Sequence, residues 1–328
     1  MTSDATPHLL TVENLVKHFR VHAGAGSSAK TLRAVDGVSL HLEAGETLGV
    51  VGESGCGKST LARLIVGLLD PTGGNVKIRG GDIWESGSAG RERRRKSQMV
   101  FQNPAGSMNP RRSVGASVAE PLQAMGIRKT DEAVERILRL VGLDPAMAVR
   151  KPHQLSGGQQ QRASIARALI AEPDLVVHDE SISSLDVSLQ AQILNLLIDL
   201  QAALGTSYIF ISHDLAAVQA ISHRIVVMYL GEVVETSPIQ EFSRQPRHPY
   251  SIALRNATLT PDPVRERNRV DIILRGDVPS PINPPSGCRF HTRCPLAKPV
   301  CSSQKPVLSD RGAGHLVACH FPDAAEHI

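Results

Sequence analysis

The stretch TLGVVGESGCGKSTLARLIVGLL, residues 47–69, decides what kind of domain this chain forms. Its first part, TLGVVG, is continuously apolar and ends in glycine, which is typical of a strand buried on both faces in a parallel sheet. Its last part is predicted to be a helix because apolar residues recur at helical spacing: Leu61, Leu64, Ile65 and Leu68. Between the two, GESGCGKST at 52–60 fits G-x-x-x-x-G-K-[ST] in the strand–loop–helix context that a phosphate-binding loop, or P-loop, requires.

A P-loop binds a nucleotide chiefly through its backbone. Its glycines allow N–H groups to point inward at phosphate oxygens, and the start of the following helix adds the positive end of its dipole. We expect Lys58 to reach the β- and γ-phosphates and the Ser59 hydroxyl to hold Mg²⁺. Cys56 is interpreted as a small tolerated residue and not as a nucleophile. The predicted nucleotide-binding residues of this loop are Gly52, Glu53, Ser54, Gly55, Cys56, Gly57, Lys58, Ser59 and Thr60.

The segment LVVHDE at 175–180 supplies acidic groups for the same kind of site. An acidic residue at the end of a buried strand can hold Mg²⁺ through water, which makes Asp179 a candidate, and Glu180 could polarise an attacking water. Either residue alone could instead cap the next helix, but both together in a chain with a P-loop favour the catalytic interpretation. Because neighbouring side chains on a strand point to opposite faces, His178 is predicted to be hydrogen-bonded in the core.

Strand and helix patterns alternate along most of the chain, which predicts an α/β domain with a mostly parallel sheet. A block of helical patterns predicts an inserted helical subdomain at about 103–165. The sequence becomes proline-rich after about residue 245, so we place a boundary near 255, with a nucleotide-binding domain at 1–255 and an extension at 256–328. The basic run RERRRKS at 91–97 is predicted to be a solvated loop, with phosphate or RNA binding as the weaker alternative.

The composition narrows the class of protein. A formal net charge of +4 over 328 residues does not indicate nucleic-acid binding, which usually needs a concentrated basic surface. No run approaches the roughly 18 apolar residues that cross a bilayer. The start, MTSDATPHLL, lacks the basic and apolar regions of a signal peptide. We therefore expect a protein that stays in the cytosol with reduced thiols and reaches a membrane only through a partner.

The stretch LSGGQQQR at 155–162 precedes a predicted long helix, so a hydroxyl, two glycine amides and a helix start form a second phosphate clamp. Together with GESGCGKST and HDE, it resembles the ATP-binding cassette (ABC) ATPases, whose signature is LSGGQ. The resemblance implies that two ATP molecules are enclosed between two subunits, each clamp reaching the nucleotide on the partner's P-loop. The residues of this clamp are Ser156, Gly157, Gly158 and Gln159.

The resemblance assigns roles to further residues. Gln102 in MVFQNP matches the Q-loop glutamine, which senses Mg²⁺ and the attacking water and links to the transmembrane partner. His213 in ISHD matches the switch histidine that contacts the γ-phosphate, and Asp186 in SSLD matches the D-loop at the dimer interface. Phe19 in KHF is a candidate for the aromatic that stacks on adenine. The implied catalytic residues are thus Glu180, His213 and Gln102, and the implied Mg²⁺ ligands are Ser59, Gln102 and Asp179.

Two positions depart from the family pattern. Ser181 follows the catalytic glutamate where the family usually has proline, and His178 stands where an apolar residue is usual. Neither change removes a catalytic group, and their effect on turnover stays open.

Longer stretches narrow the resemblance to the ATPase subunits of bacterial oligopeptide and dipeptide importers, and of the related nickel importers: GESGCGKSTLARLIVGLLDPTGG, MVFQNPAGSMNPR, ISHDLAAVQAISHRIVVMYLGEVVE and HPYSIAL. The resemblance implies an ATP-hydrolysing subunit that powers the import of short peptides. It implies that this subunit lies at the cytoplasmic face of the inner membrane. It implies as partners a second, non-identical ATPase, two permease subunits and an extracytoplasmic solute-binding protein. An importer of nickel or another small solute, a soluble non-transport ABC ATPase and a P-loop kinase of small molecules are the alternatives, the kinase being disfavoured by LSGGQQQR.

Four of the five cysteines lie in the last fifth of the chain, in GCRFHTRCPLAKPVC and ACHFPD. In some importer ATPases such cysteines hold a [4Fe–4S] cluster, and the resemblance suggests the same here; zinc and four free thiols remain alternatives. A metal at this point is expected to be structural, because a proline-rich tail buries little apolar surface. His291, His315 and His320 could replace one ligand, but exposed surface is their expected place. The candidate ligands are Cys288, Cys294, Cys301 and Cys319.

Overall fold

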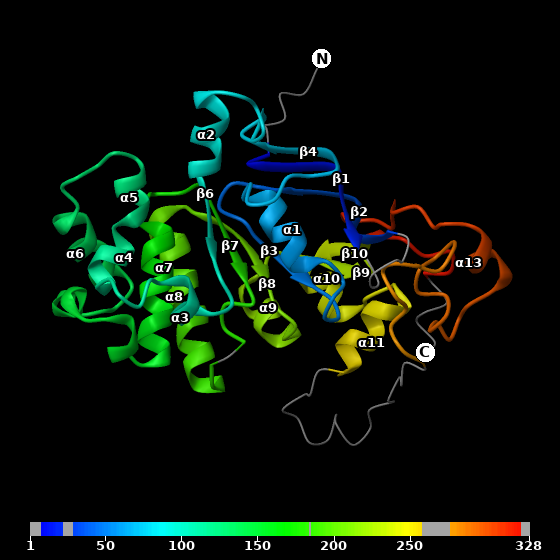
Figure 1. Ribbon diagram of the computed structural model, residues 1–328. Coiled ribbons are helices and arrows are strands. Elements are labelled where there is room, and N and C mark those ends of the chain that lie inside the picture. Colours follow the sequence, from blue (N-terminus) through cyan, green and yellow to red (C-terminus); the bar gives the residue numbers. More distant parts are fainter. Residues whose placement is uncertain (1–7, 22–28, 184, 258–275, 323–328) are drawn as a thin grey trace, which may run out of the picture.

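The computed structural model describes residues 8–21, 29–183, 185–257 and 276–322. Two sheets form the centre, with a helical region on one side and the cysteine-bearing tail on the other (Figure 1). Residues 258–275, near the start of the extension predicted at 256–328, lie outside the described residues.

The larger sheet has eight strands in the order β11-β12-β10-β9-β3-β8-β7-β6. The neighbours from β9 to β6 pair in parallel, as the alternation of strands and helices predicted. Every residue of β3, β7 and β8 is buried, which fits their continuously apolar sequences. The strands from the main part of the chain are β3 (Thr47–Val51), β6 (Ser97–Val100), β7 (Leu175–Asp179), β8 (Ser207–Ile211), β9 (Arg224–Tyr229) and β10 (Glu232–Pro238).

A second, antiparallel sheet of four strands has the order β2-β1-β4-β5. Its apolar side chains share one core cluster with β3 and with α1 (Lys58–Ile65), so the helix that follows the P-loop packs between the two sheets. The strands of this sheet are β1 (Leu10–Val21), β2 (Lys30–Leu42), β4 (Gly73–Ile78) and β5 (Gly81–Asp82). This sheet extends beyond the parallel arrangement that the sequence predicted.

The block predicted to be helical consists of short helices that end in the longer α7 (Gly157–Leu169). The apolar side chains of this region and of α7 share a second core cluster with the central sheet. The other elements of the block are α3 (Pro104–Ser107), α4 (Val114–Val118), α5 (Glu120–Ala124), α6 (Asp131–Leu140), η1 (Pro145–Val149) and η2 (Pro152–Gln154). In Figure 1 this region lies apart from α1 and the antiparallel sheet.

The basic run at 91–97 corrects one prediction, because it forms the end of helix α2 (Ser88–Arg95) and not a loop. Arg93 donates to the Asp82 carbonyl (3.2 Å), and Arg94 donates to the Ile83 carbonyl. Three arginines in the last turn also suit the negative end of the helix dipole. These contacts supply an order that the composition of the run does not reveal.

Helix α8 (Val187–Leu204) is long and apolar enough to cross a membrane by length and composition alone. Its buried residues Ile193, Leu194, Leu197 and Leu200 form a stripe that belongs to the second core cluster, the one shared by the helical region and the central sheet. A helix with one buried stripe is typical of packing against a sheet. The remaining helices of this part are α9 (Leu215–Ile221), α10 (Ile239–Arg244) and α11 (Pro249–Ala257).

The tail is joined to the central sheet by short elements: α13 (Pro299–Ser303), β11 (Ser309–Asp310) and β12 (Leu316–Val317). Strand β12 pairs with β10, opposing Val317 to Glu235. Phe290 is 1% exposed and belongs to the second core cluster, together with residues of the central sheet. The described part of the tail therefore packs as an edge of the central sheet.

Candidate functional site

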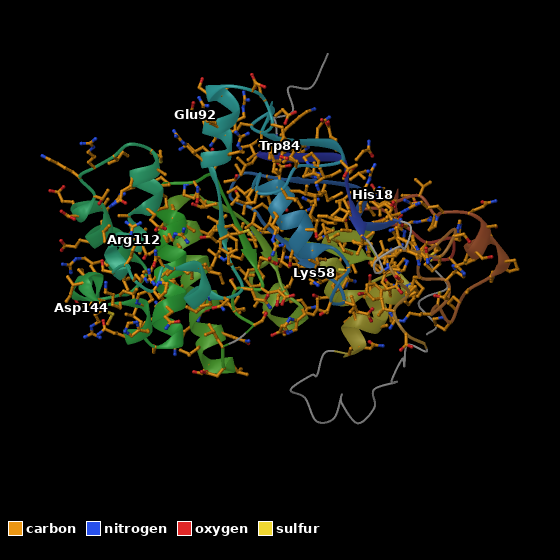
Figure 2. All side chains as sticks on the ribbon, viewed as in Figure 1. His18, Lys58, Trp84, Glu92, Arg112 and Asp144 are labelled. Carbon is orange, nitrogen blue, oxygen red and sulfur yellow. The ribbon has the colours of Figure 1, made fainter. Side chains whose placement is uncertain are left out.

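The loop between β3 and α1 adopts a conformation that glycine makes possible. Gly57 has φ of 108°, and a Cβ at this position would lie 2.1 Å from the Ala34 carbonyl oxygen. A Cβ at Gly52 would lie 2.2 Å from the Met228 carbonyl oxygen. Lys58 is 4% exposed, and its ammonium group donates to the carbonyls of Gly52 (2.6 Å) and Glu53 (3.2 Å). The loop thus curls around the lysine that the motif places at its end. Figure 2 labels Lys58 at the start of α1.

The acidic residue that ends β7, Asp179, contacts the start of α1. The Ser59 hydroxyl donates to the Asp179 carboxylate, Oγ to Oδ1, at 2.8 Å. Burial raises the pKa of Asp179, while the hydrogen bond from Ser59 and the charge of Arg63 oppose that rise. A hydroxyl and a carboxylate oxygen therefore lie side by side at the end of the P-loop, and oxygen donors of this kind suit Mg²⁺.

Three further predicted residues meet at the same edge of the sheet. The Gln102 side chain donates to the Glu180 carboxylate, Nε2 to Oε2, at 3.1 Å. His213 Nδ1 lies 3.6 Å from the same Glu180 oxygen. Gln102 follows β6, Glu180 follows β7 and His213 follows β8, and these parallel strands are neighbours in the sheet. The carboxyl ends of parallel strands are where ligands bind in open α/β sheets.

Glu180 has an unusual backbone, with φ of 49° for a residue other than glycine. Its N–H donates to the Ile211 carbonyl of β8 at 3.0 Å, which holds this conformation. Strained backbone of this kind concentrates at functional sites. The Glu180 side chain is 17% exposed and the His213 side chain 57% exposed, so the edge is open to solvent.

His178 has a buried side chain, as predicted, and the side chain of Cys56 is buried as well. His178 is 1% exposed and packs edge-on against Tyr208, with ring centroids 5.0 Å apart. Its Nδ1 lies 3.5 Å from the Ser181 hydroxyl and its Nε2 has no partner among the described residues, so hydrogen bonding in the core is weaker than expected. Burial lowers the pKa of His178 to about 3. Cys56 is 4% exposed, and burial raises its pKa, which keeps the thiol protonated.

The residues of the second phosphate clamp begin helix α7. Ser156 caps the helix: its hydroxyl accepts from the Gln159 N–H (3.4 Å), and the Gln159 side chain accepts from the Ser156 N–H (3.0 Å). Ser156 and Gly157 are exposed, and Gly158 packs against Leu189. No hydrogen bond or ion pair within the described ranges joins these residues to the P-loop. The first clamp and the second are therefore separate in one copy of the chain.

Asp186 and Phe19 are placed in secondary structure by contacts of their own. Asp186 caps α8 by accepting from the Leu189 N–H at 3.0 Å, and it is exposed. Phe19 is half-buried on β1, where the Lys17 ammonium lies 5.2 Å from its ring centroid. Among the described residues, neither Asp186 nor Phe19 makes a hydrogen bond, an ion pair or a ring contact with the P-loop.

Glu53 of the P-loop has two partners that the sequence did not predict. Its N–H donates to the Tyr250 hydroxyl at 2.7 Å. Its carboxylate accepts from both terminal nitrogens of Arg293, at 2.8 and 3.1 Å. Arg293 lies 240 positions along the chain and next to Cys294. A pairing over that distance leaves no local pattern, although an arginine beside a candidate ligand cysteine is visible in the sequence.

The four tail thiols lie close enough to influence one another electrostatically. The pKa of Cys294 is raised to about 12 by burial first and then by the charges of Cys319, Cys288 and Cys301. Burial likewise raises the pKa of Cys288 to about 11. The Cys288 N–H donates to the Cys301 carbonyl at 2.8 Å, which ties two of the candidate ligands together. Cys288 and Cys294 therefore stay protonated at neutral pH unless a cation stabilises their thiolates.

The tail histidines do not all occupy exposed surface. His315 is 3% exposed, and its Nε2 lies 2.6 Å from a carboxylate oxygen of Glu235, which is fully buried. The prediction that His315 lies on exposed surface is therefore wrong. His315 directly precedes β12, and the pairing of β12 with β10 places it in the core beside Glu235. His291 contacts the Cys288 carbonyl (2.8 Å) and His320 the Gln304 carbonyl (3.0 Å).

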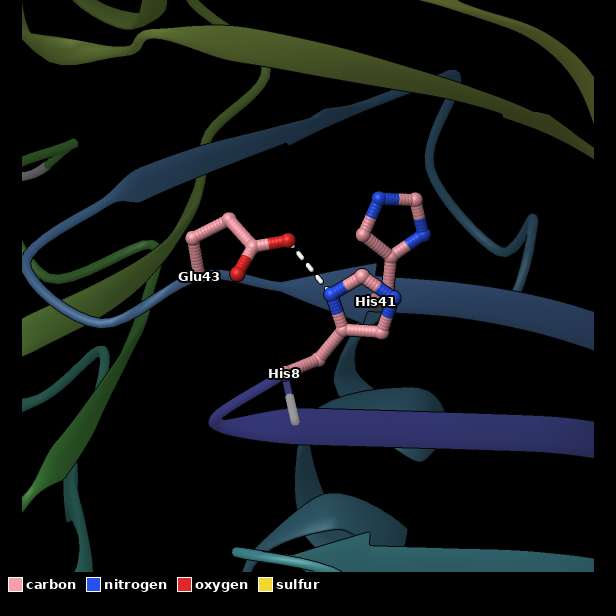
Figure 3. A group of neighbouring side chains, drawn as sticks. All are labelled: His8, His41 and Glu43. Atoms are coloured by element: carbon pink, nitrogen blue, oxygen red, sulfur yellow. Dashed lines mark hydrogen bonds and ion pairs between the residues drawn. The ribbon is translucent and has the colours of Figure 1, made fainter. Parts of the chain in front are cut away.

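A group of ligand-type side chains, His8, His41 and Glu43, joins the start of β1 to the end of β2 (Figure 3). His8 contacts the Glu43 carboxylate, and the two histidine rings stack with centroids 4.3 Å apart and an angle of 28°. Lone pairs lie in the ring plane, so those of two nearly parallel rings do not converge on one ion. Arg224 also lies close enough to lower the pKa of His41, after burial. We interpret the group as a contact between strands.

Comparisons with known proteins agree with this geometry. Residues 35–183 match the family "ABC transporter", and residues 234–301 match "Oligopeptide/dipeptide transporter, C-terminal region". The chain is similar to the "Probable peptide ABC transporter ATP-binding protein y4tS" of Sinorhizobium fredii, with 51% identity over 98% of this chain and 92% of the relative. It is 49% identical to the oligopeptide transport ATP-binding protein OppF of Salmonella typhimurium, over 95% of each chain.

A solved structure gives the same result. The ATP-binding cassette MJ0796, in a dimeric post-hydrolysis state bound to ADP and Pi, aligns with a TM-score of 0.61 and 28% identity, over 70% of this chain and 98% of that one. The P-loop, the acidic pair at the end of β7 and the helix-capping LSGGQ stretch are the parts that the sequence resemblance rested on. The chain belongs to the family of ABC transporter ATP-binding proteins of the oligopeptide and dipeptide type.

Proposed function

We propose that the carboxyl edge of the central sheet binds and hydrolyses MgATP. The observation that carries this proposal is the convergence of groups from neighbouring elements: Ser59 on Asp179 at 2.8 Å, and Gln102 on Glu180 at 3.1 Å. Lys58 lies at the end of the same P-loop with its ammonium group on backbone carbonyls, which phosphate oxygens replace when ATP binds. Backbone N–H groups of residues 52–60 cradle the phosphates.

Each side chain has a distinct role in this proposal. Glu180 accepts the proton of the attacking water. Gln102 and His213 contact Glu180, and they orient that water and the γ-phosphate. Ser59, Asp179 and Gln102 hold Mg²⁺, which neutralises charge that develops on the transferred phosphoryl group. Phe19 on β1 is assigned to stacking on adenine. Catalysis here comes mainly from orientation and electrostatic stabilisation.

A second ATPase subunit completes the site. The exposed start of α7, with Ser156 as its cap, offers free backbone N–H groups to an anion. Among the described residues, the P-loop of the same chain makes no hydrogen bond with these groups. We assign these groups to the ATP on a partner subunit, and Asp186, also exposed, to the interface between the two subunits. The partner is a non-identical homologue, in keeping with importers of this type.

The transported substrate is assigned from the relatives. OppF of Salmonella typhimurium is named as an oligopeptide transport protein and DppF of Escherichia coli, 47% identical, as a dipeptide transport protein. We propose that this chain energises import of short peptides through two permease subunits served by a solute-binding protein. It associates peripherally with the cytoplasmic face of the inner membrane. Nickel or another small solute is the alternative cargo.

We propose that Cys288, Cys294, Cys301 and Cys319 hold a [4Fe–4S] cluster. Four mutually interacting thiols fit a group with four iron atoms. Zinc with bonds of about 2.3 Å would bring its sulfur ligands to about 3.8 Å from one another. Among the described residues, only His8, His41 and Glu43 form a trio of ligand atoms within 4.8 Å, so no three of the thiols are that close. This spacing favours the wider cluster, whose role is to hold the tail together.

The test uses the full chain in cells that depend on imported peptides. Replacing the resident gene by the Lys58→Ala form is expected to abolish uptake of labelled di- and tripeptides and to leave nickel uptake intact. The tagged wild-type chain is expected to copurify from membranes with a second ATPase and two integral membrane proteins. Unchanged peptide uptake, or loss of nickel uptake alone, would overturn the assignment. Iron and acid-labile sulfide in anaerobically purified protein test the cluster separately.

A further inference from the structure

The P-loop of this chain contains a carboxylate, Glu53, in a loop that we assign to a highly charged anion. A carboxylate near a triphosphate is repelled by the like charge, and the repulsion is stronger where water is excluded. The loop therefore benefits from a cation that balances Glu53. Lys58 does not pair with this carboxylate: its ammonium group contacts the backbone carbonyls of Gly52 and Glu53.

The balancing cation comes from the tail. Both terminal nitrogens of Arg293 donate to the Glu53 carboxylate, at 2.8 and 3.1 Å. The Arg293 side chain is 8% exposed and that of Glu53 26% exposed, so water screens the pair only in part. Two-point pairing of a guanidinium with a carboxylate fixes orientation as well as charge.

The position of Arg293 is fixed by its own neighbours. Its backbone N–H donates to the Phe290 carbonyl at 3.0 Å. Phe290 is buried, with ring centroids 5.3 Å from Tyr229 and 5.4 Å from Tyr250. Tyr250 in turn accepts from the Glu53 N–H at 2.7 Å. The guanidinium and the P-loop are thus held by one packed aromatic group.

A second arginine anchors the same segment elsewhere. The Arg289 guanidinium contacts the Asp36 carboxylate and the Leu230 carbonyl. The segment 288–294 therefore enters the body of the protein at two points, and only Arg293 reaches the P-loop. Cys288 and Cys294 stand at the two ends of this segment.

We propose that Arg293 is a positioning residue for the nucleotide site: the C-terminal extension neutralises and orients Glu53, so that the P-loop accepts MgATP. The extension is in this way an integral part of the electrostatics of the nucleotide site. The inference rests on the proposed MgATP site, and it adds to that site a residue that lies outside the motifs of the cassette.

The experiment measures the dissociation constant of a fluorescent MgATP analogue with the purified full chain at low salt. Arg293→Gln leaves an unbalanced carboxylate and is expected to weaken binding about tenfold. Glu53→Gln removes the carboxylate itself and is expected to shift affinity in the opposite direction. The double variant is expected to recover most of the tenfold loss. The loss is expected to shrink at high salt, because screening weakens the repulsion.

Two variants separate this role from general destabilisation. Arg293→Lys keeps the charge without the two-point contact and is expected to fall between the wild type and Arg293→Gln. Lys305→Gln breaks another tail-to-core ion pair, with Glu232 at 2.7 Å, and is expected to leave affinity unchanged. Melting temperatures confirm that every variant is folded. The proposal is overturned if Arg293→Gln binds like the wild type, or if the double variant binds as weakly as Arg293→Gln. Failure of the wild type to bind would instead overturn the nucleotide site.

Discussion

The nucleotide-binding edge of the central sheet and the cysteine-bearing tail are held in place in different ways. At the edge, Gln102, Glu180 and His213 follow neighbouring parallel strands, so the hydrogen bonds of the sheet bring them together. The described part of the tail has two short strands, a short helix and the buried Phe290, and it is also tied to the body by side chains such as Arg289, Arg293 and His315. The edge is therefore held by the parallel strands of the central sheet, whereas the tail combines the short pairing of β12 with β10 with individual apolar and polar contacts.

The largest effect is expected from a substitution that impairs ATP hydrolysis at the edge and leaves the tail unchanged. Lys58→Ala is expected to lower ATP hydrolysis by about 100-fold or more, because a preorganised cation at the phosphates is lost. Phosphate release measures the effect. Lys77→Ala, which breaks only the exposed ion pair with Glu13, is the matched control. Equal hydrolysis by the two variants would contradict the assigned role of Lys58.

The tail is tested at Glu235, which is fully buried. Its carboxylate accepts from the N–H groups of Arg247 (2.9 Å) and His248 (2.8 Å), and it contacts His315 at 2.6 Å. Glu235→Ala is expected to lower the free energy of unfolding by about 3–5 kcal/mol, because buried donors lose their acceptor. Chemical denaturation gives this value. In Glu241→Ala, which loses only an exposed pair with Arg244, a change above about 1 kcal/mol would show that such substitutions act nonspecifically.

Two glycines of the P-loop sharpen the description of the edge. Gly57→Ala is expected to cost about 3 kcal/mol, because a left-handed φ of 108° is combined with a Cβ 2.1 Å from the Ala34 carbonyl oxygen. Gly55 has φ of 79° with no atom near the added Cβ, so Gly55→Ala is expected to cost about 1 kcal/mol. Thermal unfolding of both variants decides the matter, and equal costs would mean that the close approach to Ala34 is not maintained.

A further expected effect is a dependence of stability on pH, which comes from His178 on β7 and from His248 beside Phe290 of the tail. Burial lowers the pKa of His178 to about 3 and that of His248 to about 4. In the unfolded chain these groups titrate near 6.5, so between the two values the unfolded state binds more protons. The stabilising contribution is complete above about pH 6.5 and declines as the pH falls, by about 2 kcal/mol per histidine between pH 7 and 5.

His178→Leu isolates one of these two contributions. The histidine Nε2 has no partner among the described residues, so the substitution loses no strong hydrogen bond. The variant is expected to show a shallower loss of stability from pH 7 to pH 5 than the wild type. Denaturation at both pH values tests this, and an unchanged slope would place the pH dependence on other groups.

The edge could be predicted from the sequence because its information is local. GESGCGKST follows the buried strand β3, and LVVHDE and ISHD contain the ends of β7 and β8, so each motif lies where a strand ends, and a parallel sheet brings such strand ends to one side. The helix α2 was missed because its arginines are ordered by carbonyls of residues 82–83, which composition does not show. The antiparallel pairing of β1 with β4 was missed for a similar reason, since strand patterns give no partner.

In the tail, the sequence indicated an extension of the importer type and a group of cysteines whose ligand role stays a prediction, but it did not indicate how the tail folds. Its strands β11 and β12 have two residues each, too few for a periodic pattern. The burial of His315 depends on β12 lying beside β10, and the pairing of Arg293 with Glu53 joins positions 240 apart. Contacts of this length are set by the packing of the whole chain, and no short window of sequence contains them.

The most direct test of the hydrolytic edge is the nucleotide recovered from the Glu180→Gln variant. The purified full chain is incubated with radiolabelled MgATP, and the bound nucleotide is separated and identified as ATP or ADP over time. Our account predicts that the variant retains ATP while the wild type converts it to ADP, because Glu180 is the group that activates water beside Gln102 and His213. Conversion to ADP at the wild-type rate would contradict it.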